Sequence, residues 1–190
     1  MQLFDGGTLT NQTGGTISGS TGVFASGTGS IDNAGSIAGS TEGVFLTGAT
    51  LTNEGAITGE VFADNNASVV NAGQISASTV GLYASATTNV TNQAGGTIRG
   101  ANGVELTGYG ALTNDGSIAG NGVNGDNAGN GVNGDNAGNG AGAVISGDGA
   151  ITNRADGTIT GATGGNDAGV GLYGVSNYVY YNGTFYRFGY

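Results

Sequence analysis

The sequence predicts an all-β protein in which the chain winds into a parallel β-solenoid of about seven coils, with three short strands in each coil. Three observations lead to this prediction. A unit of roughly 20 residues returns along the chain, apolar residues alternate with small or polar ones within each unit, and the chain contains 43 glycines but no proline. Alternation with period two is typical of half-buried strands. Strands this short bury a face only when successive coils stack about 4.8 Å apart.

The first strand of each unit is an apolar residue, a variable residue and an asparagine, as in Leu51-Thr52-Asn53. Asparagine side chains stacked at a corner can hydrogen-bond from coil to coil and to the backbone of the turn. We therefore interpret this column as a structural ladder rather than a site for a ligand. Its members are Asn11, Asn33, Asn53, Asn71, Asn92, Asn114 and Asn153.

The second strand of each unit is marked by one isoleucine between small residues, after a turn that contains glycine. We expect these isoleucines to form one buried column through the whole rod. The column consists of Ile17, Ile37, Ile57, Ile75, Ile98, Ile118 and Ile159. Glycine suits such turns because it adopts a positive φ without strain.

The third strand begins with a small residue and an apolar residue, and the next side chain is expected to point outward. These outward positions are Phe24, Phe45, Phe62, Tyr83, Glu105, Ile145 and Tyr173. Four consecutive coils would therefore stack aromatic rings. Such a stack either stiffens the sheet by lateral packing or forms an exposed stripe that docks another rod or a sugar. Between these partners, docking to protein is favoured, because sugar sites usually add several polar groups.

Residues 121–140 interrupt the repeat with a nine-residue sequence that occurs twice, and we expect them to form an inserted low-complexity loop outside the core. An enlarged corner around residues 161–169 should emerge from the same edge of the rod. Nonapeptides rich in Gly, Asn and Asp resemble a calcium-binding roll, which makes Asp126 and Asp135 candidate calcium ligands. The glycine spacing differs from that roll, so a polar loop without metal is the preferred interpretation.

Residues 1–175 are expected to form the solenoid, and residues 176–190 an aromatic C-terminal hairpin. Asn182-Gly183 between apolar runs is a strong signal for a two-residue turn. In that register Tyr180 pairs with Phe185 and Val179 with Tyr186. The hairpin either caps its own solenoid or connects to another subunit. Its candidate interaction residues are Tyr178, Tyr180, Phe185, Tyr186 and Phe188.

Composition argues against several classes of function. With 13 acidic residues, three arginines, no lysine and a net charge of -10, the chain should repel nucleic acid and anionic membranes. No apolar run approaches the length of a membrane span, and the first residues show no signal peptide. Histidine, cysteine and lysine are absent and the acids are scattered, so neither an enzyme nor a cofactor is expected.

The stretch Leu51-Thr52-Asn53-Glu54-Gly55-Ala56-Ile57-Thr58-Gly59 resembles the passenger repeats of bacterial autotransporters and related haemagglutinin-like surface proteins. The resemblance covers about residues 6–175 and concerns the repeats only, with no barrel domain. It implies a right-handed β-helix displayed on the bacterial cell surface or outside the cell, in an adhesive or structural role. The chain would then be a passenger fragment, a protein exported by another route, or a subunit that self-associates into fibres.

Partners expected from these patterns are further copies of the chain and, secondarily, a host surface or glycan. Ice binding is an alternative, because paired threonines such as Thr8/Thr10 and Thr50/Thr52 point outward from the first strands. That array is interrupted by Asp32, Val70, Ala111 and Ala150. A polysaccharide-binding solenoid is the other alternative.

Overall fold

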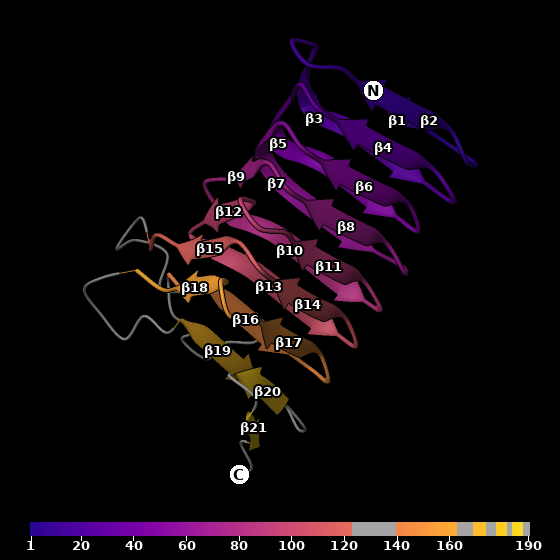
Figure 1. The fold of residues 1–190 in the computed structure, drawn as a ribbon. Coiled ribbons are helices and arrows are strands. Elements are labelled where there is room, and N and C mark those ends of the chain that lie inside the picture. The colour runs from indigo at the N-terminus through magenta and orange to yellow at the C-terminus, as the bar shows by residue number, and fades with distance from the viewer. Residues whose placement is uncertain (123–139, 163–168, 174–177, 182–183, 188–190) are drawn as a thin grey trace.

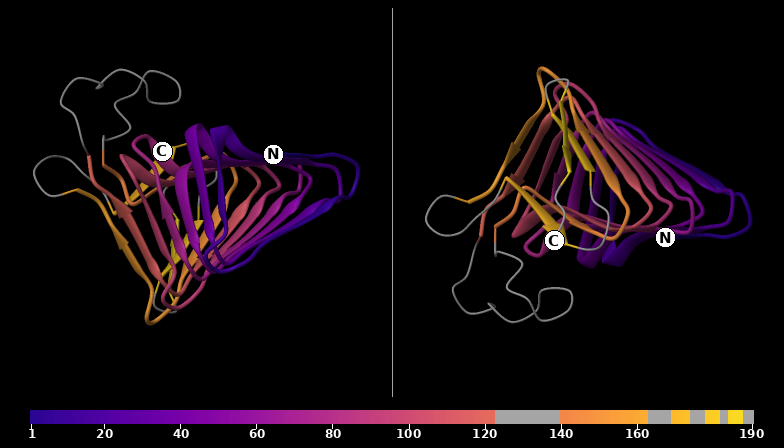
Figure 2. Two further views of the ribbon diagram at one scale, coloured as in Figure 1. Left: turned by 90° about the horizontal axis from the view of Figure 1, so that it is seen from above. Right: turned by 90° about the horizontal axis from the view of Figure 1, so that it is seen from below.

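The computed structural model describes residues 1–122, 140–162, 169–173, 178–181 and 184–187. The described residues contain strands and no α-helix, so none of them forms a helix that could cross a membrane. Parallel strands stack coil upon coil, with the two termini at opposite ends of the rod (Figure 1). Seen from above and below, each coil is roughly triangular (Figure 2). The predicted parallel β-solenoid is therefore confirmed.

The first face of the triangle is a nine-stranded sheet in the order β2-β4-β6-β8-β11-β14-β17-β20-β21. Its strands are β2 (Thr8–Asn11), β4 (Ser30–Asn33), β6 (Thr50–Asn53), β8 (Ser68–Asn71), β11 (Asn89–Asn92), β14 (Ala111–Asn114), β17 (Ala150–Asn153), β20 (Tyr178–Tyr181) and β21 (Thr184–Arg187). From β2 to β17 every strand has four residues, and neighbours pair in parallel without a shift in register. Six full turns therefore separate β2 from β17, which agrees with the prediction of about seven coils.

The second and third faces share a 12-stranded sheet. In the first three coils, a single long strand covers both faces: β3 (Thr16–Ser26), β5 (Ser36–Thr47) and β7 (Ala56–Asp64). Later coils use separate strands: β9 (Gln74–Ser76) with β10 (Val80–Ala86), β12 (Thr97–Gly100) with β13 (Asn102–Gly108), β15 (Ser117–Gly120) with β16 (Ala143–Ser146), and β18 (Thr158–Thr160) with β19 (Val170–Tyr173). The long strands bend where their pairing register shifts, as between Gly19 and Thr21. The predicted three separate strands per coil are therefore found only from the coil that begins with β8.

A short extra strand, β1 (Gln2–Leu3), extends the third face by one level at the N-terminal end, where it pairs with β3. Phe4 follows it and packs against Phe24. No repeat marker in the sequence predicts this strand, because it precedes the first complete repeat.

The core is a set of parallel columns that run along the rod axis. The seven predicted isoleucines are direct neighbours from Ile17 to Ile159. The five inner members are fully buried, whereas Ile17 and Ile159 at the ends are half-buried. A second column of Leu9, Ile31, Leu51, Val69, Val90, Leu112 and Ile151 comes from the first face. One continuous core therefore joins all coils, as the repeat pattern predicted.

The corner between the third and first faces depends on left-handed backbone conformation. Gly48 adopts a φ of 76° there, and an added Cβ would lie 3.2 Å from the carbonyl oxygen of Gly27. Two coils further on, Ala86 holds a φ of 53° although it carries a Cβ. Glycine is the residue that adopts this region without strain, which explains why the corner is rich in glycine.

The third-face register predicted for the last two coils is wrong, by one residue at Ile145 and by two residues at Tyr173. Glu105 pairs with Val144, and Val144 pairs with Gly171. Ile145 instead pairs with Leu106 and is fully buried, and Tyr173 pairs with Ser146. The insertion before β16 changes the number of residues between Ile118 and the third strand, so the register cannot be found by counting. The residues Ala143-Val144-Ile145 are all apolar and all buried, so their hydrophobicity does not give the register either.

Candidate functional site

The asparagines form a hydrogen-bonded ladder at the end of the first-face strands. Each side-chain amide Nδ2 donates to the Oδ1 of the next asparagine along the rod, over 2.7 to 2.8 Å. The members from Asn33 to Asn114 are at most 2% exposed. All six bonds between successive asparagines run in one direction along the column, so the ladder has a donor side and an acceptor side.

Each rung also holds the adjoining turn. The Nδ2 of Asn71 lies 3.3 Å from the carbonyl oxygen of Gly73 in its own coil and 3.3 Å from that of Thr97 in the next coil. A Cβ on Gly73 would lie 2.1 Å from the carbonyl oxygen of Gly55, so only glycine fits beside the ladder. Buried amides with matched partners stabilise the structure rather than bind a ligand.

The four predicted aromatics stack along the third face and are half-buried. Ring centroids lie 5.2 Å apart for Phe24 and Phe45, 4.7 Å for Phe45 and Phe62, and 5.2 Å for Phe62 and Tyr83. The planes deviate by only 11° to 17°, so each inner ring turns its faces to its neighbours. A sugar that stacks on a ring needs a free face. The column therefore offers ring edges, which suit lateral packing.

The aromatic column ends at Glu105, which occupies the next outward position after Tyr83. Glu105 is 9% exposed, and burial raises the pKa of its carboxyl group above the ordinary value of 4.5. The Nδ2 of Asn102 donates to Oε1 of Glu105 over 2.7 Å, which partly opposes this shift. The Oδ1 of Asn102 accepts hydrogen bonds from the backbone N–H groups of Gly140 and Ala141. Glu105 and Asn102 thus hold the chain where it re-enters the core.

A second carboxylate with a raised pKa, Glu60, lies on the same face beside the aromatic column. Desolvation is the main cause, and the negative charges of Glu105 and Glu42 add to it. Hydroxyl groups from neighbouring coils bind these acids: Thr79 donates to Glu60 over 3.2 Å, and Thr21 donates to Glu42 over 2.7 Å. Within the described residues no three of the His, Cys, Asp or Glu side chains are placed to hold a metal ion.

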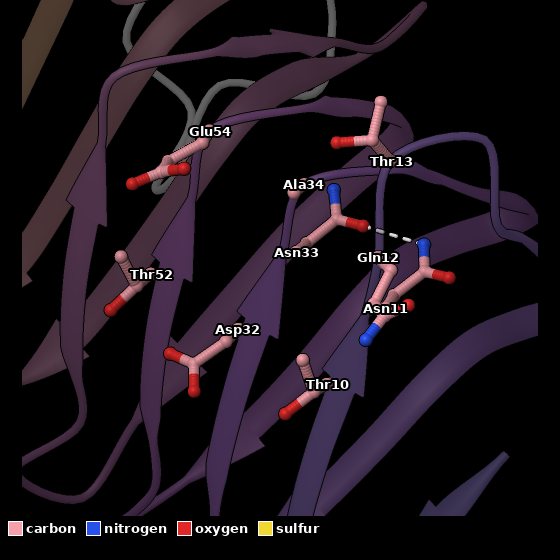
Figure 3. A pocket seen from close by; sticks show the side chains of 9 residues that line it. All are labelled: Thr10, Asn11, Gln12, Thr13, Asp32, Asn33, Ala34, Thr52 and Glu54. Carbon is pink, nitrogen blue, oxygen red and sulfur yellow. Dashed lines mark hydrogen bonds between the residues drawn. The ribbon is translucent and has the colours of Figure 1, made fainter.

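A shallow groove of about 570 Å³ crosses the first three strands of the first face, near the asparagine corner. Figure 3 shows its lining, where Thr10, Asp32 and Thr52 lie side by side on β2, β4 and β6. Gln12 and Glu54 lie at its rim, and both are exposed. Hydroxyl, amide and carboxylate groups of this kind hydrogen-bond polar ligands, but the groove is too open to enclose one.

The C-terminal hairpin joins the first face. β20 pairs in parallel with β17, and β21 pairs antiparallel with β20. Val179 pairs with Tyr186 and Tyr180 with Phe185, as the turn signal predicted. Tyr178 pairs with Ala150 on one side and Arg187 on the other. Tyr181 takes the register position next to Asn153, so no asparagine follows at the end of the ladder.

Three candidate residues, Asp126, Asp135 and Phe188, lie outside the described residues. Two exposed aromatics of the described residues carry no mark in the repeat pattern: Phe4, 58% exposed, and Tyr109, 71% exposed. Phe4 could have been found by extending the third-strand pattern backward from Phe24. Tyr109 lies in a corner, where the strand pattern predicts nothing.

Comparisons of this chain with protein-family models, with curated proteins and with solved structures each found no match.

Proposed function

We propose that this chain is a stiff rod that acts outside the bacterial cell or on its surface, in a structural or adhesive role, and that copies of it associate. The observation that carries this proposal is the uninterrupted stack of strands, which builds a long core but no enclosed site among the described residues. A repetitive rod of this kind spans distance and offers extended faces. An autotransporter-like origin is supported by the repeat pattern alone.

The ends of the rod support self-association. A sheet that stops leaves one row of backbone donors and acceptors without a neighbour, and such edges pair readily with other strands. Among the described strands, β2 pairs with β4 alone. The first face, by contrast, presents mostly short polar side chains such as Thr50, Ser68 and Asn89. Association through ends is therefore favoured over association through the first face.

A catalytic role receives no support from the described side chains. Glu42, Glu60 and Glu105 are the nearest approach to an acid cluster, and each is held by a hydroxyl or amide of its own scaffold. General acid–base chemistry needs a group that reaches a substrate. Glu105 follows Tyr83 in the register of the packed rings, and Glu42 pairs with Glu60 on neighbouring strands.

Electron microscopy combined with light scattering tests the proposal. We expect the purified chain to form elongated particles whose mass rises with protein concentration. Because the net charge is -10, raising the salt concentration should screen repulsion and promote the association. A particle of monomer mass at every concentration and salt level would contradict self-association. Protease treatment of intact cells, which should digest a surface protein, tests the location separately.

A further inference from the structure

We infer that β7 and its neighbours on the third face form a docking surface for an extended segment of another protein, in which an apolar side chain stands between two cationic ones. This inference rests on the proposed adhesive role and specifies the chemistry of the partner. Three features of the face lead to it: the order of its outward side chains, the unused oxygens of its carboxylates, and a negative charge that no cation of the described residues neutralises.

Strand β7 presents a carboxylate, a ring and a second carboxylate to the outside. Its residues 60 to 64 alternate between half-buried and fully buried. Glu60, Phe62 and Asp64 therefore point outward, while Val61 and Ala63 enter the core. Outward side chains two residues apart on a strand are separated by roughly 6.6 Å. The strand thus carries two negative groups with an apolar group halfway between them.

The neighbouring coils extend this surface along the rod. β5 places Glu42 beside Glu60 and Phe45 beside Phe62, and β10 places Tyr83 on the other side of Phe62. Ring centroids lie 4.7 Å apart for Phe45 and Phe62 and 5.2 Å apart for Phe62 and Tyr83, so the rings cover each other's faces. Their edges remain available, and an aliphatic side chain packs against ring edges by close apolar contact alone.

The two carboxylates of β7 are each held by one oxygen. The hydroxyl of Thr79 donates to Oε2 of Glu60 over 3.2 Å. The hydroxyl of Ser85 and the backbone N–H of Asn65 both donate to Oδ1 of Asp64 over 2.7 Å. Oε1 of Glu60 and Oδ2 of Asp64 accept no hydrogen bond from the described residues. Side chains already fixed in this way lose little further entropy when a partner binds.

The negative charge of this surface is not neutralised within the described part of the chain. The one ion pair there joins Arg154 to Asp115, which lie in the turns after β17 and β14. Burial raises the pKa of Glu60, and repulsion by Glu105 and Glu42 adds to the shift. The ionised form of Glu60 is therefore destabilised, and an ammonium or guanidinium group beside it offsets this cost.

The separation of the carboxylates selects the kind of partner. Glu60 and Asp64 are about 13 Å apart along the strand. That distance excludes one shared metal ion, because a metal needs converging oxygens within about 2.6 Å. Alternate side chains of an extended segment repeat at the spacing of β7, so a cation, an apolar residue and a cation at every second position match it. A second copy has no such segment, because it contains no lysine and its three arginines are far apart in the sequence.

Fluorescence anisotropy with a labelled synthetic peptide and the full chain tests the inference. The probe is a threonine-rich peptide that carries lysine, leucine and lysine at alternate positions, and the control peptide has the same composition with the two lysines adjacent. We expect the probe to bind at least about tenfold more tightly than the control, and salt should weaken this binding. Equal binding of the two peptides would overturn the inference, because net charge alone would then explain it.

Paired substitutions locate the binding surface. Glu60→Gln combined with Asp64→Asn removes both charges and keeps an oxygen at each position for the hydroxyl groups that hold it. This variant should bind the probe at least about tenfold more weakly. Asp32→Asn combined with Glu54→Gln is the matched control, since it removes two exposed charges from the first face and should leave binding unchanged. An equal loss in both variants would refute the assignment to the third face.

Replacing the ring tests the apolar part of the pattern. Phe62→Thr should weaken binding of the probe several-fold and leave the weak binding of the control peptide unchanged, because only the probe places leucine on the ring. Circular dichroism should show the variant folded. If it is not folded, the charge variants decide the matter alone. Folded Phe62→Thr protein that binds the probe as tightly as wild type would refute the role of the aromatic column.

Light scattering on the same samples separates this inference from the proposed function. Elongated particles that associate but do not distinguish the two peptides would refute the inference and leave self-association intact. Selective binding of the probe by a chain that stays monomeric would support the inference and refute self-association. If Glu60→Gln combined with Asp64→Asn altered the association of copies and not the binding of the probe, the face would be an interface between copies and the inference would be overturned.

Discussion

The asparagine column and the aromatic column are both stacks with one side chain per coil, yet they differ in extent. The asparagine column continues through seven first-face strands, whereas the aromatic column is replaced by Glu105 after Tyr83. Asparagine offers a donor and an acceptor in fixed directions and also holds the turn, so another residue would leave buried groups unpaired. Rings make contacts without such direction, and a half-buried position accepts other side chains. Directional hydrogen bonding thus explains the greater regularity of the first column.

The largest expected effect comes from breaking the ladder at its centre. Asn71→Ala removes the bonds to Asn53 and Asn92. Asn53 Nδ2 then keeps only its longer contacts to turn carbonyls, and the buried Oδ1 of Asn92 loses its donor. We expect the free energy of unfolding to fall by about 3 kcal/mol, measured by chemical denaturation. Asn11→Ala, which loses only one ladder bond, should cost about 1 kcal/mol. Equal losses at the two positions would contradict the ladder as the source of stability.

Truncating a central ring should have a smaller effect. Phe45→Ala loses stacking with Phe24 and Phe62, but the side chain is only half-buried. We expect a loss of about 2 kcal/mol in the same denaturation experiment. Phe4→Ala, which has one ring neighbour at 5.7 Å, should cost well under about 1 kcal/mol. A loss for Phe45→Ala larger than that for Asn71→Ala would reverse the ranking of the two columns.

The smallest expected effect is a gain in stability, and it concerns Glu105, where the aromatic column ends. Burial raises the pKa of Glu105 above 4.5, so the folded chain binds this proton more tightly than the unfolded chain. The stability that protonation provides is present below pH 4.5 and is lost as the pH rises through the raised pKa. Glu105→Gln should therefore stabilise the protein at neutral pH, and the difference from wild type should disappear toward pH 4.5.

A control separates this effect from the loss of charge alone. Glu54→Gln removes one exposed carboxylate at the rim of the groove. Thermal unfolding across the pH range should show little change for this variant. A Glu105→Gln variant that is less stable than wild type at neutral pH would show that the carboxylate is needed to bind Asn102.

Much of the fold could be predicted from the sequence because each uninterrupted coil carries its own markers. In these coils the number of residues from the asparagine to the isoleucine, and from the isoleucine to the third strand, stays nearly constant. The neighbours of Ile57 and Phe45 in adjacent coils can therefore be found by counting residues. The candidate surfaces were less predictable. The groove between Thr10 and Glu54 arises from three coils together, and the burial of Glu105 depends on contacts around Asn102. Neither leaves a signal within one repeat.

By itself the sequence determined the strand period, the asparagine and isoleucine columns and the hairpin pairing of Val179 with Tyr186, because periodic residues and a two-residue turn set register locally. Only the tertiary structure decided that β3, β5 and β7 run through a corner, that Val144 rather than Ile145 follows Glu105, and that Phe4 extends the aromatic column. In each of these cases several registers or bends bury similar apolar surface. The choice among them depends on contacts with the coils above and below, which are distant in the sequence.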